Sequence, residues 1–308
     1  MAATTSEAAA GVGRPTIDDL GLGTGKRARL YDMLYNHGAR NGTLQILPID
    51  HGMEHGPIDF FPNPASADPD FQFELAVRGD YSGIACQIGF AEKYYPRYAG
   101  RVPLILKVNG KTNIPPDDDA HSPLNATVED AVRLGAHAVG YTLYVGSPEQ
   151  SRHHEELNLV RAECERYGLP LIVWSYPRGS AIEAKGGRDC IYAVDYAARL
   201  AMEMGADVVK LNVPKKSDKD ALMPEKYRQL EWDYAEGARR VVKSAGRTMV
   251  LFSGGSKLGD DDLIEKARLA MEAGATGLIF GRNMWQRPME EALAITARVR
   301  ELFVAYGA

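Results

Sequence analysis

The sequence is poor in several features that define whole classes of protein. Its 308 residues include three cysteines, Cys86, Cys164 and Cys190, which are far apart and show no Cys-x-x-Cys spacing. We therefore expect reduced thiols in a cytoplasmic protein, with neither a disulfide framework nor a zinc site. No apolar run approaches membrane-spanning length, and no basic start leads into an apolar core, so we expect neither a membrane span nor a secretory signal.

Positive charge is also scarce. The chain has 36 Lys and Arg against 41 Asp and Glu, a net charge of −5, which argues against nucleic acid or an anionic membrane as a partner. Any phosphate-binding surface must therefore be local. Hydrophobic residues make up 45% and charged residues 25% of the chain, as expected for a globular protein with a substantial core.

Strand-like and helix-like stretches alternate along the chain. Strands are predicted at 44–49, 82–88, 103–109, 138–145, 170–176, 207–213, 248–252 and 276–280. Helices are predicted at 18–39, 69–78, 128–134, 148–167, 188–204, 224–245, 260–273 and 289–305. This pattern predicts an α/β fold, a single (β/α)8 TIM barrel over 17–308 with an extra N-terminal helix, after a mobile tail over 1–16. An open doubly wound sheet is the alternative.

Two further features concern the connections. A Gly-Ala joint leads from a helix into a strand at Gly135, Gly205 and Gly274, where glycine can take the left-handed conformation that ends a helix. The segment 215–225 is polar, rich in lysine and long for a strand-to-helix connection. It is either a lid over a site or a solvated excursion.

One lysine stands in the middle of an apolar strand-like run, Lys210 within 205–214. Such a lysine must be used, paired or neutralised, or else extend to solvent. Because side chains alternate along a strand, Lys210 shares its predicted inward face with Asp50, Lys107 and Tyr176, at the C-terminal ends of three other strands. Barrel active sites lie at that end. Structural pairing of Asp50 with one lysine is the alternative, but it leaves the other lysine and Tyr176 without a role.

Glycine-rich turns follow the last two predicted strands. Ser253, Gly254 and Gly255 follow the seventh, and Gly281 and Arg282 follow the eighth. Barrels often bind phosphate at these two strand ends, where glycine lets backbone amides approach the anion. The two turns together predict a phosphate site.

These parts indicate a reaction class. A lysine amine can attack a ketone to form an iminium ion, an electron sink that lets a neighbouring carbon–carbon bond break or form. The pKa of Lys210 must then be lowered, by burial or by a positive charge that Lys107 could supply. Tyr176 or Asp50 could transfer the protons. The residues predict a metal-independent aldolase acting on a sugar phosphate.

Five motifs occur in order: LPIDHGMEHGP at 47–57, WSYPRG at 174–179, the lysine strand, SGG at 253–255 and GRNMWQ at 281–286. In these the chain resembles, from about residue 44 to its final helix, the class I fructose-1,6-bisphosphate aldolases of the archaeal and bacterial (DhnA) type. The resemblance implies reversible cleavage of fructose 1,6-bisphosphate to dihydroxyacetone phosphate and glyceraldehyde 3-phosphate, in glycolysis and gluconeogenesis, with no metal or other cofactor. It also implies a homo-oligomer, a ring or ring pair of up to ten subunits.

The resemblance also implies residue roles. Lys210 forms the Schiff base, Tyr176 is the main acid/base, and Asp50 assists proton transfer and orients substrate hydroxyls. The remaining residues predicted to bind substrate or phosphate are Ser253, Gly254, Gly255, Gly281, Arg282, Lys107, Trp174 and His55.

Three local features bear on these roles. The lysine strand continues as Leu211–Pro214 into the segment 215–225, where the family often has a Thr- or Tyr-containing segment, and Ser256 stands where proline is frequent. Both concern the second phosphate contact and the lid. His51 and His55 lie four apart in a Gly/Pro-rich turn where we do not expect helical spacing, so we interpret them as loop-shaping or substrate-side residues rather than metal ligands.

Two alternative functions remain open at this point. The first is another lysine-dependent enzyme on the same barrel, such as 2-amino-3,7-dideoxy-heptulosonate synthase or an enzyme that processes a signal-sugar phosphate, because the fold does not choose between them. The second is a non-catalytic sugar-phosphate binding protein. The presence of Asp50, Tyr176 and Lys210 together argues against the second.

Overall fold

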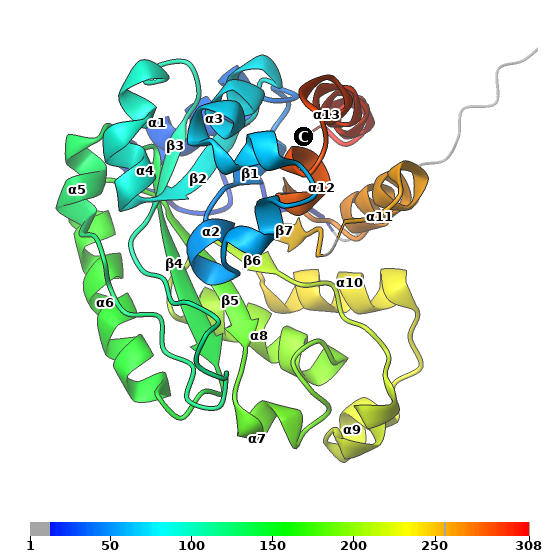
Figure 1. The fold of residues 1–308 in the computed structure, drawn as a ribbon. Helices are drawn as coiled ribbons and strands as arrows, with labels where there is room; N and C mark the ends of the chain where they lie inside the picture. Colours follow the sequence, from blue (N-terminus) through cyan, green and yellow to red (C-terminus); the bar gives the residue numbers. More distant parts are fainter. Residues whose placement is uncertain (1–12, 256, 308) are drawn as a thin grey trace, which may run out of the picture.

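A closed barrel of eight parallel strands forms the centre of the protein, in a computed structural model that describes residues 13–255 and 257–307. The strands pair in chain order, and helices surround them (Figure 1). They are β1 Leu44–Pro48, β2 Gly83–Gln87, β3 Leu104–Lys107, β4 Ala138–Val145, β5 Leu171–Pro177, β6 Val208–Leu211, β7 Met249–Ser253 and β8 Gly277–Ile279. The predicted TIM barrel is confirmed, and because β1 pairs with β8 the open sheet is excluded.

The longer helices lie outside the barrel, and short ones follow several strand ends (Figure 1). They are α1 Thr24–Tyr31, α2 His51–Glu54, α3 Pro69–Arg78, α4 Ile88–Lys93, α5 Val128–Arg133, α6 Gln150–Tyr167, α7 Ser180–Glu183, α8 Ile191–Glu203, α9 Glu225–Arg228, α10 Tyr234–Ser244, α11 Asp260–Glu272, α12 Arg282–Trp285 and α13 Met289–Val304.

Three helix predictions need correction. Helix α4 was not predicted, because its six residues start directly after β2 and are too few to show helical periodicity. The predicted helix 224–245 is broken between α9 and α10, where Asp233 forms a capping box with Glu236 and starts a second helix. The predicted helix 18–39 is shorter: α1 is followed by a π-helical turn, Asp32–Asn36, and no helix covers 18–23.

Apolar side chains fill the barrel interior. Ile46, Ile105, Ile172 and Val208 belong to one buried cluster there, which confirms the predicted inward phase of four strands. The same cluster includes Leu30 and other residues of the N-terminal helical segment. That segment therefore closes the N-terminal end of the barrel and leaves the C-terminal strand ends for a site.

The Gly-Ala joints have the backbone conformation that the sequence predicts. Gly135, Gly205 and Gly274 have φ angles of 67°, 87° and 93°. Any other residue would be strained there, so these glycines fix where α5, α8 and α11 stop.

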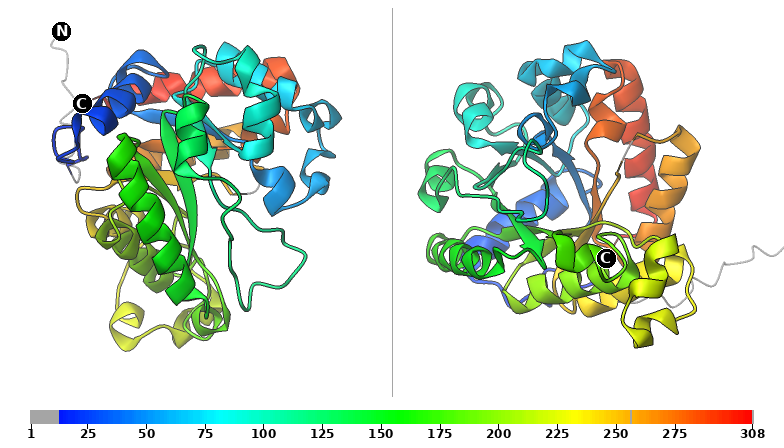
Figure 2. Two further views of the ribbon diagram at one scale, coloured as in Figure 1. Left: turned by 90° about the vertical axis from the view of Figure 1, so that its left-hand side faces the viewer. Right: turned by 60° about the horizontal axis from the view of Figure 1, so that its bottom comes forward.

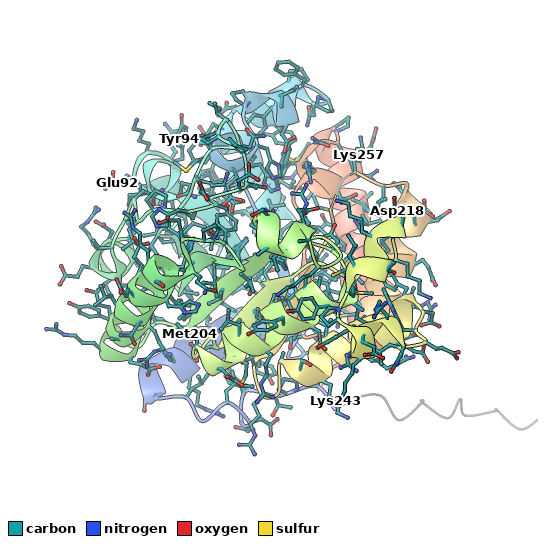
Figure 3. The ribbon with its side chains drawn as sticks, turned by 90° about the horizontal axis from the view of Figure 1, so that it is seen from below. Glu92, Tyr94, Met204, Asp218, Lys243 and Lys257 are labelled. Carbon is teal, nitrogen blue, oxygen red and sulfur yellow. The ribbon has the colours of Figure 1, made fainter. Side chains whose placement is uncertain are left out.

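Two long connections lie at the C-terminal side of the strands. The loop over 108–127 projects beyond the barrel (Figure 2, left, teal) and is pinned at its base by the bridge between Asn109 and Leu124. The segment 215–225 instead packs on the α7–α8 region, where Met223 is buried against Cys190. Its Asp218 lies towards the edge of the molecule (Figure 3).

The ends of the chain bear on two predictions. Of the predicted tail over 1–16, residues 1–12 lie outside the described residues, while Arg14 donates a hydrogen bond to the carbonyl of Tyr306. The boundary at residue 17 therefore stays a prediction. Among the described helices, none has the length and apolar character needed to cross a bilayer.

Candidate active site

A cavity of about 740 Å³ opens at the C-terminal ends of the strands. Nine of the predicted site residues line it: Asp50, His55, Tyr176, Lys210, Ser253, Gly254, Gly255, Gly281 and Arg282. Lys107 and Trp174 do not line the cavity, because both are fully buried in the floor beneath it. The structure therefore brings the predicted catalytic residues to one place and puts two predicted substrate contacts behind them.

Lys210 reaches the cavity from β6 and is 6% exposed. Its Nζ lies 5.3 Å from the ring centroid of Trp174 and 5.4 Å from that of Tyr176. Within the described residues, no carboxylate lies within 4.0 Å of this nitrogen. Lys210 is therefore neither an exposed lysine at a strand end nor, within the described residues, a partner in a structural ion pair.

Burial is the main reason that the pKa of Lys210 falls to about 8. The carboxylates of Asp50 and Glu54 oppose this shift, and the cations Lys107 and Arg282 add to it. The sequence analysis proposed Lys107 as the source of the shift; Lys107 contributes, but less than burial. A useful fraction of Lys210 is thus a neutral amine near pH 7, as a Schiff-base nucleophile requires.

Lys107, in contrast to Lys210, is paired with two carboxylates. It ends β3 with no exposed surface, and its Nζ lies 2.9 Å from Oδ2 of Asp50 and 2.7 Å from Oε1 of Glu54. Burial alone would lower the pKa of Lys107, but these two carboxylates outweigh it and raise the pKa. Lys107 is therefore a fixed cation, and of the two lysines at this site only Lys210 can act as a free amine.

Asp50 stays ionised through the same contact. Burial alone would raise its pKa, but the ammonium group of Lys107, and to a smaller extent that of Lys210, lowers it below the usual range. The sequence analysis considered a structural ion pair between Asp50 and one lysine as the alternative to catalysis, and such a pair exists. It uses Lys107 and leaves Lys210 and Tyr176 free for chemistry.

Glu54 is a site residue that the sequence analysis missed. It lines the cavity at the end of α2, and Asp50 is the N-cap of the same helical turn. Residues four apart in a helix lie on one face, so both carboxylates reach Lys107. The Asp50-x-x-x-Glu54 spacing was the available signal. It was overlooked because this segment was predicted to be a non-helical turn.

The expectation that helical spacing does not apply to His51 and His55 is wrong, since His51 opens the helical turn α2 and its carbonyl accepts a hydrogen bond from the backbone N–H of His55. The ring centroid of His51 lies 5.1 Å from that of His55 and 5.2 Å from that of Trp285. Burial lowers the pKa of His51 to about 3, so it is neutral. His55 instead pairs with Asp59, its Nδ1 2.8 Å from Oδ2. Among the described residues, no group of three or more His, Cys, Asp or Glu could hold a metal ion.

Tyr176, on β5, lines the cavity with its ring centroid 5.4 Å from the Lys210 Nζ. Burial raises its pKa well above 10, and the carboxylates of Glu54 and Asp50 add to this shift. The phenol is therefore protonated in the free protein. It can act as a proton donor first and as a base only after it has given its proton away.

The two glycine-rich turns are tightly enclosed. A Cβ on Gly254 would lie 2.7 Å from Nδ2 of Asn283, and one on Gly281 would lie 2.5 Å from Cε1 of His51. Both positions therefore exclude a side chain. Ser253, at the end of β7, donates a hydrogen bond of 2.7 Å to Oδ1 of Asn212. Ser256, the departure from the family pattern, lies outside the described residues.

A group of charged residues at the rim of the cavity was also missed. Asp117 lies 3.0 Å from Nζ of Lys111, 3.1 Å from Nε of Arg178 and 3.6 Å from Nη1 of Arg188. All four line the cavity. Only Arg178 lies in a quoted motif; Lys111 and Asp117 come from the loop after β3, which carries no periodic pattern.

The chain is similar to known aldolases over most of its length. A model of the DeoC/LacD family of aldolases matches residues 44–287, most of the chain. The chain belongs to the DeoC/LacD aldolase family. This confirms the resemblance noted in the sequence, and the archaeal class I enzymes are among the similar members.

Two relatives illustrate how far the similarity of this DeoC/LacD aldolase extends. The class 1 fructose-bisphosphate aldolase of Thermoproteus tenax is 42% identical over 273 residues, covering 87% of this chain and 92% of that protein. The corresponding protein of Halobacterium salinarum is 40% identical over 252 residues, covering 81% and 86%.

Solved structures agree with the sequence comparison. An archaeal fructose-1,6-bisphosphate aldolase, with its catalytic lysine covalently bound to the carbinolamine intermediate, superposes with a TM-score of 0.75 at 39% identity, over 89% of this chain and 98% of that one. A fructose-bisphosphate aldolase from Slackia heliotrinireducens gives a TM-score of 0.81 at 27% identity, over 95% and 92%. The family's barrel and that of this aldolase are the same fold.

Proposed function

We propose that this family member is a class I fructose-1,6-bisphosphate aldolase with Lys210 as its Schiff-base residue. The observation that carries the proposal is the buried amine of Lys210, which forms no ion pair among the described residues and lies 5.4 Å from the ring centroid of Tyr176 in a cavity that Asp50 also lines. The lysine chemistry of the similar archaeal aldolase supports it, as does the identity of about two residues in five with the enzyme of Thermoproteus tenax.

The first stage is formation of the Schiff base. The neutral amine of Lys210 attacks the C2 carbonyl of the open-chain ketose and gives a carbinolamine. The phenol of Tyr176 donates its proton to the departing C2 hydroxyl, which leaves as water, and the iminium ion remains. The nearby carboxylate of Asp50 favours this cation, because the two charges are opposite.

The second stage breaks the bond between C3 and C4. A base removes the proton of the C4 hydroxyl, the electrons of the C3–C4 bond move into the iminium, and glyceraldehyde 3-phosphate leaves. The Tyr176 phenolate formed in the first stage is that base, assisted by Asp50. Protonation of the enamine at C3 and hydrolysis then release dihydroxyacetone phosphate and the free amine.

Phosphate groups at both ends position the substrate. The C1 phosphate binds the turns of Ser253–Gly255 and Gly281–Arg282, close to Lys210. The ring centroid of Tyr176 is 5.4 Å from the Lys210 Nζ and 5.3 Å from the Arg178 Cζ. The rest of a ketohexose chain and its terminal phosphate can span the separation between Lys210 and Arg178. The distal phosphate therefore binds Arg178 and its neighbours at the rim.

Lys107 and Trp174 support this site from below. Both are buried, and the Lys107 Nζ lies 4.7 Å from the Trp174 ring centroid. Lys107 holds Asp50 ionised, and Trp174 forms an apolar floor beneath Lys210. Direct contact with substrate, which the sequence analysis predicts for both, would need a path through that floor. His55 remains the candidate for a contact at the cavity wall.

The biological setting is also a proposal. The family resemblance supports a role in glycolysis and gluconeogenesis, in the cytoplasm, by a homo-oligomer that forms a ring or ring pair of up to ten subunits. Sedimentation equilibrium tests the assembly, since a ring requires a mass several times that of the 33.7 kDa chain.

Borohydride trapping with dihydroxyacetone phosphate tests the mechanism. We expect a mass increase on the peptide that carries Lys210, and none in Lys210→Met. A label on Lys107 would refute the assignment of the nucleophile. Cleavage of fructose 1,6-bisphosphate, measured with and without EDTA, separates this activity from that of the heptulosonate synthase and of a non-catalytic binding protein. No cleavage under either condition would refute the proposed function.

A further inference from the structure

Asp117 is surrounded by cations at the mouth of the cavity. Its two carboxylate oxygens face Lys111, Arg178 and Arg188 at 3.0 to 3.6 Å. Burial alone would raise the pKa of Asp117, but the three cations together lower it. One carboxylate thus sits among three positive charges, in the manner of a bound anion.

The position of this cluster is the important point. Lys210 pairs in register with Trp174, and Tyr176 and Arg178 follow two and four residues further along the same segment. The Tyr176 ring centroid lies 5.4 Å from the Lys210 Nζ and 5.3 Å from the Arg178 Cζ. A substrate held by Lys210 therefore extends past Tyr176 towards these cations. A phosphate arriving there meets groups that Asp117 already neutralises in part.

Asp117 lies on a stretch of loop outside the barrel, in which residues 112–116 are all exposed. The loop projects from the strand ends (Figure 2, left), and residues 111–119 form no helix or strand. Its return is pinned at Ala120, whose carbonyl accepts hydrogen bonds from Ser147 and His153. At the tip, the side chain of Asp117 is 39% exposed. The tip is held by the charge contacts of Asp117 and by a hydrogen bond of 3.3 Å that Asn113 donates to the carbonyl of His55.

We propose that Asp117 is an internal counter-ion that occupies the place of the substrate's distal phosphate and is displaced when that phosphate binds. This inference rests on the proposed function, because it uses the same cavity and the same substrate class. A phosphate ester that reaches only the inner glycine turns leaves Asp117 in place. A ligand with a second phosphate must compete with it. Asp117 therefore sets the ratio of affinities for bisphosphates and monophosphates.

Binding of two sugar alcohols tests the inference independently of catalysis. Hexitol 1,6-bisphosphate and hexitol 1-phosphate have no carbonyl and form no Schiff base, so calorimetry measures binding alone. For Asp117→Asn we expect roughly three- to tenfold tighter binding of the bisphosphate, the size of a half-exposed ion pair, and unchanged binding of the monophosphate. The gain should shrink at high salt.

Asp119→Asn is the matched control, because it removes the same charge two residues along the same loop. Asp119 is exposed and, within the described residues, forms no ion pair. It should leave the bisphosphate-to-monophosphate ratio at the wild-type value. If Asp119→Asn tightened bisphosphate binding as much as Asp117→Asn, the effect would come from net charge alone, and the inference would be overturned.

Other outcomes are equally decisive. Weaker or unchanged bisphosphate binding by Asp117→Asn would mean that Asp117 orders the cations instead of competing with phosphate, and the inference fails. The same holds if the wild type binds neither hexitol. If Asp117→Asn gives the expected selective gain but the wild type cleaves no fructose 1,6-bisphosphate, the counter-ion stands and the proposed function fails.

Discussion

Replacement of Glu54 by glutamine provides a sharp test of the electrostatics around Lys210. The change removes one negative charge from the cavity wall and keeps the shape of the side chain. Lys107 keeps its contact with Asp50, so no buried cation is left unpaired. Because the Glu54 carboxylate raises the pKa of Lys210, its removal should lower that pKa below about 8.

The size of the effect follows from the distances. The ammonium nitrogens of Lys107 and Lys210 lie 4.7 and 5.3 Å from the Trp174 centroid, and Glu54 lies 2.7 Å from Lys107. Glu54 is therefore no more than about 13 Å from Lys210, and at an effective dielectric constant of about 20 one charge contributes at least about 1.3 kcal/mol, close to one pKa unit.

The assay is kcat/KM for cleavage of fructose 1,6-bisphosphate as a function of pH. In the wild type, activity should rise with pH as Lys210 loses its proton, with a midpoint near 8. In Glu54→Gln the midpoint should fall by about one unit. The pH dependence of borohydride trapping should shift in parallel, because it reports the same free amine.

Glu92→Gln is the control for this experiment. Glu92 lies on α4 at the edge of the molecule (Figure 3) and pairs with Arg133 at 2.7 Å. Its replacement removes the same charge and one ion pair, so its pH profile should match that of the wild type. If the midpoint of Glu54→Gln stays in place or rises, the account of the Lys210 pKa is refuted.

Three further predictions concern single residues. Tyr176→Phe should lower kcat by about 10² to 10⁴ and should also slow borohydride trapping of Lys210, because the phenol donates the proton that leads to the iminium; near-wild-type kcat would exclude Tyr176 as the acid/base. Lys26→Met should lower the free energy of unfolding in urea by about 3–5 kcal/mol, because it leaves Asp207 buried without the ammonium 2.9 Å away; an unchanged midpoint would contradict this. Between pH 8 and 10 the unfolded chain binds more protons at Lys210, so wild-type stability should rise relative to Lys210→Met; parallel stability curves would contradict the lowered pKa.

The site residues that the sequence did not reveal lie in segments without helical or strand periodicity. Strand positions such as Lys210 and Tyr176 could be placed because alternation gives the direction of a side chain and strand order gives its end of the barrel. Glu54 was missed because α2 is a single helical turn, too short to show a pattern. Lys111 and Asp117 were missed because nothing in a loop's sequence shows which rim residue it will meet.

The sequence by itself determined the barrel, the inward phase of its strands and the set of groups at their C-terminal ends. Those features follow from the helical and strand periodicity of the apolar residues and from the order of the elements, both of which can be read from the sequence. Only the tertiary structure decided the state of the two lysines. Lys107 is held as a cation by carboxylates 57 and 53 residues away, while Lys210 forms no ion pair with any carboxylate in the described part of the chain. Charge state depends on burial and distances of a few ångströms, and these exist only once the chain has folded.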